Sequence, residues 1–227
     1  MDIAAHIRQV KAKIADACAR CNRSQEDVRL VAVSKRKSSA LIDQAYAAGQ
    51  TCFGESYVQE FQQKAKEVSA PVEWHFIGHL QSNKVKYLCN QVALIHSVDR
   101  WSLAEEIDRQ WGKLGQVAPI LIQVNLGAEA SKSGTTMAGL KDLVERIAGL
   151  HHVEVRGLMT LPPWCEDPEE VRPYFRALRE LAGEIARLNL PNVTMSELSM
   201  GMSHDFQVAI EEGATLIRVG TAIFGPR

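Results

Sequence analysis

Residues 29–37 read RLVAVSKRK and begin the alternating pattern from which the fold can be predicted. Leu30–Val33 form a short apolar, β-branched run, which is typical of a buried strand, and the run ends in Ser34 and Lys35. Taking an unpartnered ammonium group out of water is costly, so a lysine at the end of a buried strand usually has a function or a partner. The role of Lys35 therefore depends on what the rest of the chain places around this strand end.

The same kind of apolar run recurs along the chain. We expect strands at residues 30–33, 51–53, 72–77, 93–98, 119–125, 153–159, 193–198 and 214–219. Amphipathic stretches of helical period lie between them; one covers residues 168–188, where Asp167 is a candidate cap, Pro168 suits the first helical position and Glu170 completes a capping-box pattern. Strand–helix alternation indicates a parallel sheet, and a count of about eight favours closure into a (β/α)8 TIM barrel.

An open, doubly wound sheet is the competing fold. It is disfavoured because no GxGxxG follows the first strand. An extra N-terminal helix precedes the barrel, and its apolar face includes both thiols of a CxxC, Cys18 and Cys21. A zinc site would need a second ligand pair at suitable spacing, which the sequence lacks, so we expect both thiols to pack in the core. Without linkers or repeats, we predict one domain over residues 1–227.

Composition and charge exclude several classes of protein. Hydrophobic residues make up 46% of the chain and charged residues 23%, and the net charge is −1, so nothing favours nucleic acid or an anionic membrane as a partner. No apolar run approaches the roughly 20 residues that cross a bilayer, and the N-terminus does not resemble a signal peptide. Five scattered cysteines argue against a disulfide scaffold. We expect a cytoplasmic protein.

Polar and glycine residues follow most of the predicted strands, where a barrel has its active site. These segments are Ser34-Lys35, Gly54–Tyr57, Gly78-His79, Asn125, Met159-Thr160, Ser199–Ser203 and Arg218–Thr221. The last two indicate a phosphate site, because barrels bind phosphate there with backbone N–H groups and a short helix. We expect Ser203 to cap a helix that runs to Glu212, and Gly220 to allow close backbone approach beside the Thr221 hydroxyl. Each segment alone is equally consistent with a simple turn.

A lysine and a phosphate site at one barrel mouth suggest a phosphorylated carbonyl ligand. Lysine amines form Schiff bases when desolvation or nearby cations lower their pKa, and Arg36 and Lys37 are candidate cations. Pyridoxal 5′-phosphate (PLP) has both groups, and so does a phosphosugar substrate of an aldolase. The residues alone do not separate these two ligands.

Ordered segments from about residue 30 to the C-terminus resemble the pyridoxal phosphate homeostasis proteins, which fold like the barrel domain of alanine racemase. These segments are VAVSK, FGESYVQE, EWHFIGHLQSNK, SKSG, RGLMT, LSMGMSHDF and RVGTAIFGPR. The resemblance implies that Lys35 holds PLP as a Schiff base and that Arg218 faces the pyridine nitrogen. It also implies a phosphate site made by Ser203, Gly220 and Thr221, with backbone help from Met202.

The chain departs from the family pattern at two points. Ser56 stands where the family usually has asparagine, so we keep it as a cofactor-binding candidate with a different side-chain contact. Ala130 replaces an asparagine that often precedes SKSG. We assign no role to His204, and the roles of His79 and Lys132 near the mouth stay open.

Two features favour a PLP carrier over an enzyme. An arginine beside the pyridine nitrogen disfavours its protonation, whereas electron-sink chemistry usually uses an acidic partner. The last strand is expected to end near residue 221, which leaves no chain for the β-domain that gives alanine racemase its second acid/base group. We predict a monomeric protein that buffers PLP and passes it to recipient apoenzymes, without substantial catalysis. The alternatives are a PLP-dependent amino acid racemase and a Schiff-base aldolase acting on a phosphorylated sugar.

Overall fold

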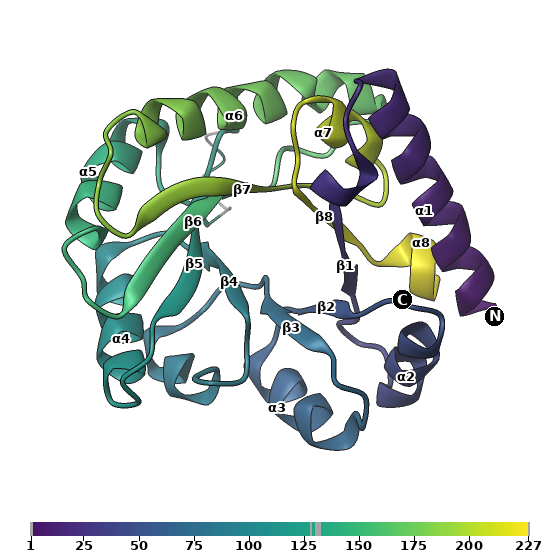
Figure 1. Ribbon diagram of the computed structural model, residues 1–227, viewed down its shortest axis with the longest axis horizontal. Coiled ribbons are helices and arrows are strands. Elements are labelled where there is room, and N and C mark those ends of the chain that lie inside the picture. The colour runs from purple at the N-terminus through teal and green to yellow at the C-terminus, as the bar shows by residue number, and fades with distance from the viewer. Residues whose placement is uncertain (1, 128, 130–132, 227) are drawn as a thin grey trace.

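Eight parallel strands form a closed barrel in the computed structural model, which describes residues 2–127, 129 and 133–226 (Figure 1). Each strand pairs with the next, and β8 closes the ring on β1. The strands are β1 (Arg29–Val33), β2 (Cys52–Glu55), β3 (Glu73–Phe76), β4 (Leu94–Val98), β5 (Ala118–Val124), β6 (Val153–Thr160), β7 (Val193–Met202) and β8 (Leu216–Val219). Every predicted strand overlaps an observed one, and the predicted (β/α)8 barrel is confirmed.

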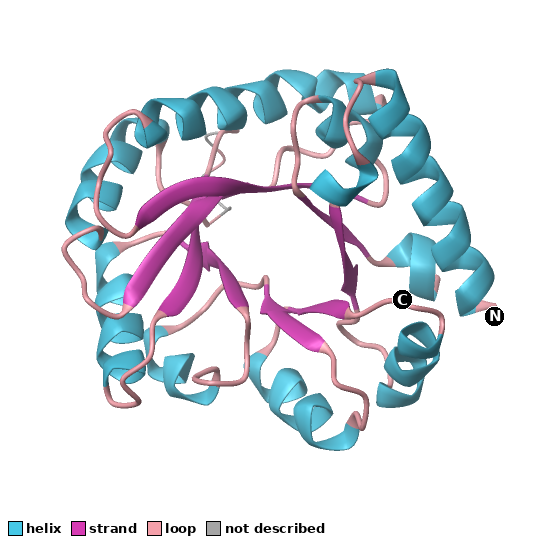
Figure 2. Cartoon of the chain, in the orientation of Figure 1, coloured by secondary structure: helices cyan, strands magenta, loops and turns pink. Residues whose placement is uncertain are grey.

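Helices surround the ring of strands (Figure 2). The α-helices are α1 (Ile3–Arg20), α2 (Ser39–Ala47), α3 (Val58–Glu67), α4 (Trp101–Gly112), α5 (Met137–Ile147), α6 (Arg172–Ala186), α7 (Phe206–Glu211) and α8 (Thr221–Phe224). The 3-10 helices are η1 (Gln25–Asp27), η2 (Ser82–Tyr87) and η3 (Pro168–Val171). The predicted N-terminal helix is α1, which contacts α8 and α7, so the two ends of the chain lie close together (Figure 1).

The helix predicted over residues 168–188 is divided in two. Pro168–Val171 form the 3-10 helix η3, capped as expected by Asp167, which accepts a hydrogen bond from the Glu169 N–H at 2.9 Å. The α-helix begins only at Arg172. A continuous helix would need an N–H at position 173, and Pro173 has none, so the chain starts a new helix there.

The core has two layers. The larger layer lies between strands and helices and includes the predicted stripe of α6 and the apolar face of α1. The smaller layer fills the barrel interior with Val31, Cys52, Leu94, Leu121, Met159 and Leu216. Cys18 is buried, Cys21 packs half-buried against the same core, and both are free thiols, so the expected packing role of the CxxC is confirmed.

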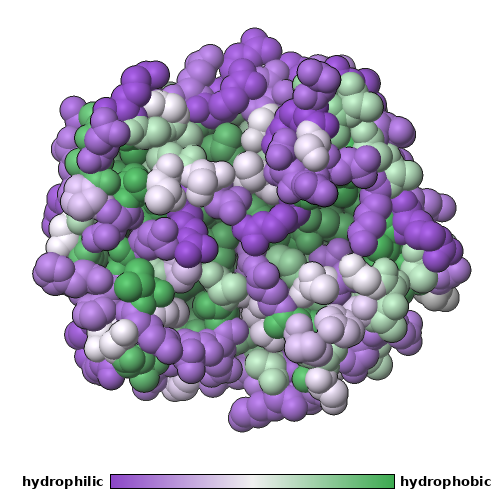
Figure 3. Space-filling model, viewed as in Figure 1, coloured by the Kyte–Doolittle hydropathy of each residue, from purple (hydrophilic) through white to green (hydrophobic). Residues whose placement is uncertain are grey.

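The molecular surface is largely hydrophilic in the view of Figure 3, where hydrophobic residues show mainly in the hollows between polar side chains. In the part of the chain that the structure describes, no helix is both long enough and apolar enough to cross a bilayer.

Candidate functional site

One cavity at the C-terminal ends of the strands brings the predicted cofactor-binding residues together. Its lining includes all of them: Lys35, Ser56, Met202, Ser203, Arg218, Gly220 and Thr221. The cavity has a volume of about 260 Å³ and adjoins a second one of about 610 Å³, with which it shares Lys35, Ser56, Ile77 and Leu161. Together the two reach the size of small-ligand sites, roughly 300–1,000 Å³.

A buried ion cluster lies beneath the turn that carries Lys35. The Lys64 ammonium of α3 donates to the Ser34 carbonyl at 2.6 Å and pairs with Glu55 at 2.8 Å and Glu60 at 2.7 Å. The Ser34 hydroxyl also donates to Glu55, at 2.6 Å. Burial raises the pKa of Glu55, although the hydrogen bonds from Lys64 and Ser34 act in the opposite direction. The cluster fixes the end of β1, which sets the position of Lys35.

The two residues after Lys35 are held separately. The Arg36 N–H donates to Glu60, and Arg36 has a φ of 61°, so the chain turns sharply directly after the lysine. The Lys37 ammonium donates to the carbonyls of Phe224 at 2.9 Å and Pro226 at 2.8 Å. Lys37 therefore ties the C-terminal segment to the cavity wall, beyond the role of neighbouring cation that we expected for it.

The hydrogen bonds at the expected phosphate site differ from the prediction. Ser203 does not cap α7, which begins at Phe206 and has Asp205 at the cap position. Instead, the Ser203 Oγ accepts a hydrogen bond from the Gly220 N–H at 3.2 Å and joins the ends of β7 and β8. The Met202 N–H donates to the Asp205 carboxylate at 2.6 Å, so this backbone donor already has a partner.

Gly220 and Thr221 lie where β8 passes into α8. A Cβ at position 220 would lie 3.2 Å from the Val33 carbonyl oxygen, so a side chain there would press on the strand that precedes Lys35. The first hydrogen bonds of α8 run from the N–H groups of Ile223 and Phe224 to the Gly220 carbonyl, at 3.0 and 2.9 Å. The preceding N–H groups belong to the open first turn of the helix.

Arg218 crosses the floor of the cavity. Its guanidinium donates to the Ser199 hydroxyl at 2.5 Å and to the Thr160 carbonyl at 2.9 Å. Burial lowers the pKa of Arg218 to about 10, so the side chain remains a cation at neutral pH. Two fixed contacts on different strands hold the charge in one orientation.

A histidine pair continues from Ser199 into the barrel. His96 Nδ1 lies 2.8 Å from the Ser199 Oγ, and His96 Nε2 lies 2.9 Å from His75 Nδ1. His75 Nε2 lies 2.7 Å from Glu73 Oε1. His75 lies within the strand expected at residues 72–77 and is buried, but its partners were not predicted. The sequence signal for such a buried polar contact is a polar residue within an otherwise apolar strand.

Because His96 is neutral in the folded protein, we expect the protein to lose stability in acid. Burial, with His75 and Arg218 nearby, lowers the pKa of His96 well below its ordinary value. The unfolded chain therefore takes up a proton near pH 6.5 that the folded chain does not, so stability is lost as the pH falls below 6.5. In urea unfolding between pH 7.5 and 5, the free energy of unfolding of the wild type should fall more steeply with decreasing pH than that of His96→Gln. The difference in slope should be up to about 1.4 kcal/mol per pH unit. Equal slopes would contradict a neutral His96.

The remaining candidates lie around the mouth. His79 lines the second cavity, where its Nδ1 is 3.1 Å from the Ser133 Oγ. His204 lines the first cavity, donates to the Glu166 carbonyl at 2.9 Å and stacks on Trp164 at 6.2 Å. Ala130 and Lys132 fall outside the described residues.

Comparison with known proteins gives consistent matches over the whole chain. The sequence model of the family "Alanine racemase, N-terminal domain" matches residues 6–227. The pyridoxal phosphate homeostasis protein of Aquifex aeolicus (strain VF5) is 47% identical over 100% of this chain and 99% of its own length. The protein of the same name in Escherichia coli (strain K12) is 40% identical over 100% of this chain and 97% of its own.

A solved structure agrees with these sequence relatives. PipY of Synechococcus elongatus PCC7942, solved with PLP bound, superimposes with a TM-score of 0.83 at 40% identity, covering 93% of this chain and 100% of PipY. The chain therefore belongs to the alanine racemase N-terminal domain family and, within it, to the pyridoxal phosphate homeostasis proteins.

Proposed function

We propose that this protein binds PLP in the first cavity, as a Schiff base on Lys35, and buffers and delivers it rather than using it for rapid catalysis. One observation carries the proposal: Lys35 lines the same cavity as Ser203, Gly220 and Thr221. Among the described lining residues there are cations but no carboxylate, which suits a phosphorylated ligand. The curated relatives are named for PLP homeostasis, and PipY binds PLP.

Each lining residue has a proposed task. The Lys35 amine condenses with the PLP aldehyde, and water is released; the reverse reaction with water frees the cofactor. The hydroxyls of Ser203 and Thr221 and the open first turn of α8 bind the phosphate. Ser56 contacts the ligand from the β2 side. Arg218 faces the pyridine nitrogen, and because a guanidinium can only donate, that nitrogen must stay unprotonated.

The proposed setting is the cytoplasm, where the chain acts as a monomer on PLP-dependent apoenzymes. A carrier should release PLP to such an apoenzyme without turning over amino acids. We expect the PLP-loaded protein to activate an added apo-aminotransferase. We also expect α-proton exchange of alanine in deuterated water to be far slower than ordinary turnover, which is on the order of 1–1,000 per second. Exchange within that range would favour the racemase alternative.

Thr221→Val tests the phosphate site. The substitution removes a hydroxyl donor at nearly constant volume, so PLP binding should weaken about tenfold, the effect of one lost hydrogen bond to a charged group. Thr221→Ser keeps the hydroxyl and serves as the matched control. Pyridoxal, which lacks the phosphate, should bind the three proteins equally. A Thr221→Val protein that still binds PLP with unchanged affinity would place the phosphate elsewhere.

A further inference from the structure

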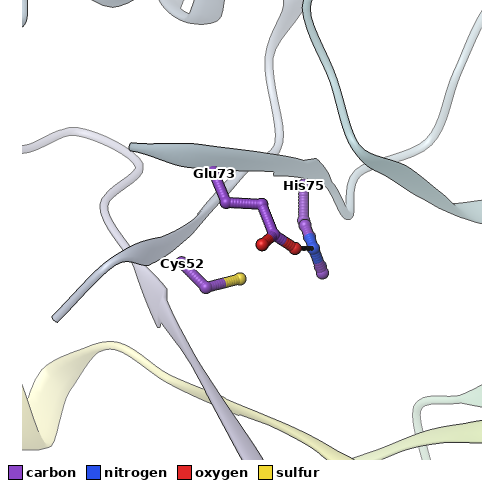
Figure 4. Close-up of side chains that lie close together, drawn as sticks. All are labelled: Cys52, Glu73 and His75. Atoms are coloured by element: carbon purple, nitrogen blue, oxygen red, sulfur yellow. Dashed lines mark hydrogen bonds and ion pairs between the residues drawn. The ribbon is translucent and has the colours of Figure 1, made fainter. Parts of the chain in front are cut away.

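Five side chains form a continuous line of hydrogen bonds from the cavity to the opposite, N-terminal mouth of the barrel. In order they are Arg218, Ser199, His96, His75 and Glu73, which we call the barrel relay. Figure 4 shows the Glu73 end of the relay, at the N-terminal mouth. Glu73 and His75 project from the same side of β3 and form a hydrogen bond, and the Cys52 thiol lies beside them. The Glu73 side chain is 41% exposed, so the relay ends at solvent.

The two ends of the relay fix the direction of its hydrogen bonds. Arg218 can only donate, and a Glu73 carboxylate can only accept. The hydrogen bond from His75 lowers the pKa of Glu73, which keeps this group ionised at neutral pH. Between the ends, Ser199, neutral His96 and neutral His75 each contribute one hydrogen. The four bonds of the relay are thus filled by one hydrogen each, all pointing from Arg218 toward Glu73.

This count assigns both histidine tautomers. His96 Nδ1 accepts from Ser199, so its proton is on Nε2; His75 Nδ1 accepts from His96, so its proton is also on Nε2. If either ring carried its proton on Nδ1, or if His75 were charged, His96 would donate to Ser199. The Ser199 hydroxyl would then need another acceptor, and its side-chain partners among the described residues are only His96 and Arg218. Ser199 is fully buried, which makes an unsatisfied hydroxyl costly.

We propose that Ser199, His96, His75 and Glu73 are positioning residues, which act through one directed hydrogen-bond line to hold Arg218 as a fixed donor toward the cavity. Aligned hydrogen bonds polarise one another, so the carboxylate at the far mouth strengthens the contact that orients the guanidinium. The role toward PLP rests on the proposed function. The tautomers do not, because they follow from contacts within the protein.

The Cys52 thiol suggests a competing role for the Glu73 end of the relay, namely a metal site. Its sulfur lies within 4.8 Å of ligand atoms of Glu73 and His75, a grouping that could hold a metal ion. A metal at His75 Nε2 would displace the proton there and force the ring into the other tautomer. The Arg29 guanidinium, 3.4 Å from Glu73 Oε1, also opposes a cation at this place. The tautomer of His75 therefore separates the two roles.

Nitrogen-15 NMR of the histidine rings in the ligand-free protein tests the relay. We expect neutral Nε2–H rings for His75 and His96 at pH 7.5. His6 is an internal reference of the opposite kind, because its Nδ1 lies 2.8 Å from the Ile223 carbonyl and must carry the proton. Through-bond correlation of each ring to its backbone assigns the signals without substitutions. An Nδ1–H or charged ring at position 75 or 96, with or without added Zn²⁺, would overturn the relay.

Substitutions then test the positioning role. Ser199→Ala should disturb the His96 tautomer and weaken PLP binding about tenfold, because a hydrogen bond to the Arg218 cation is lost. Glu73→Ala removes the acceptor of the His75 Nε2–H and should lower the fraction of the Nε2–H tautomer at both rings, whereas Glu73→Gln keeps an acceptor and should retain the wild-type tautomers. Glu197→Gln is the matched control, since Glu197 pairs with Arg29 at the same mouth but is not in the relay.

Unchanged PLP affinity in a folded Ser199→Ala protein would overturn the positioning role, even with the expected tautomers in the wild type. An altered histidine tautomer in Glu197→Gln would refute the barrel relay, because the tautomers would then depend on a residue outside it. Absence of PLP binding by the wild type would instead refute the proposed function and leave the tautomer result standing.

Discussion

Replacing Lys35 with alanine should abolish the yellow colour of the PLP-loaded protein completely. Lys37 is the other lysine among the described residues that line this cavity, and its ammonium donates to the C-terminal carbonyls of Phe224 and Pro226. The fold should persist because Lys35 is only half-buried and stands beyond the end of β1. We expect the free energy of unfolding to change by less than about 1 kcal/mol.

Absorbance after incubation with PLP and gel filtration measures this result, with urea unfolding to check the fold. Lys84→Ala is the matched control, because Lys84 lines the adjoining cavity and should leave the colour unchanged. A folded Lys35→Ala protein that keeps the wild-type absorbance would exclude Lys35 as the attachment point.

Lys64→Met should produce the largest loss of stability, about 3–5 kcal/mol. Methionine fills similar space but leaves the buried Glu55 carboxylate without its cation, and breaking a buried pair costs about this much. The Ser34 carbonyl loses its donor as well, so the turn before Lys35 should loosen. The free energy of unfolding in urea is the measurement.

Two further proteins make this test specific. Lys66→Met removes an exposed lysine of the same helix and should change stability by less than about 0.5 kcal/mol. The double variant Lys64→Met/Glu55→Gln removes the unpaired charge and should recover part of the loss. If the single variant is as stable as the wild type, the cluster does not hold the turn.

The strands and the mouth residues were predictable because their signals are local. Apolar, β-branched runs mark each strand, and the residues that follow a strand must lie at one end of a parallel barrel. This is why Lys35 and the Gly220–Thr221 turn could be placed together before the structure. His75 falls within one of these apolar runs, residues 72–77, and is buried in the structure.

The contacts that hold these residues depend on pairs distant in sequence. Lys64 falls on the apolar stripe of α3, beside Phe61, but only the folded chain brings it beneath Ser34. Ser203 has the sequence of a helix cap, yet Gly220 offers it a partner 17 residues away. Ser199 was expected at the end of its strand, but no local signal shows that its hydroxyl meets His96 of β4. Local propensity therefore gave the positions of the site residues but not their partners.

Borohydride reduction of the PLP-loaded protein, followed by peptide mapping, tests whether Lys35 carries the cofactor. Reduction makes the bond between the lysine nitrogen and the cofactor permanent, so mass spectrometry can locate it. We expect a single modified peptide with the adduct on Lys35. An adduct on Lys37 or Lys84 instead, or no adduct at all, would contradict it.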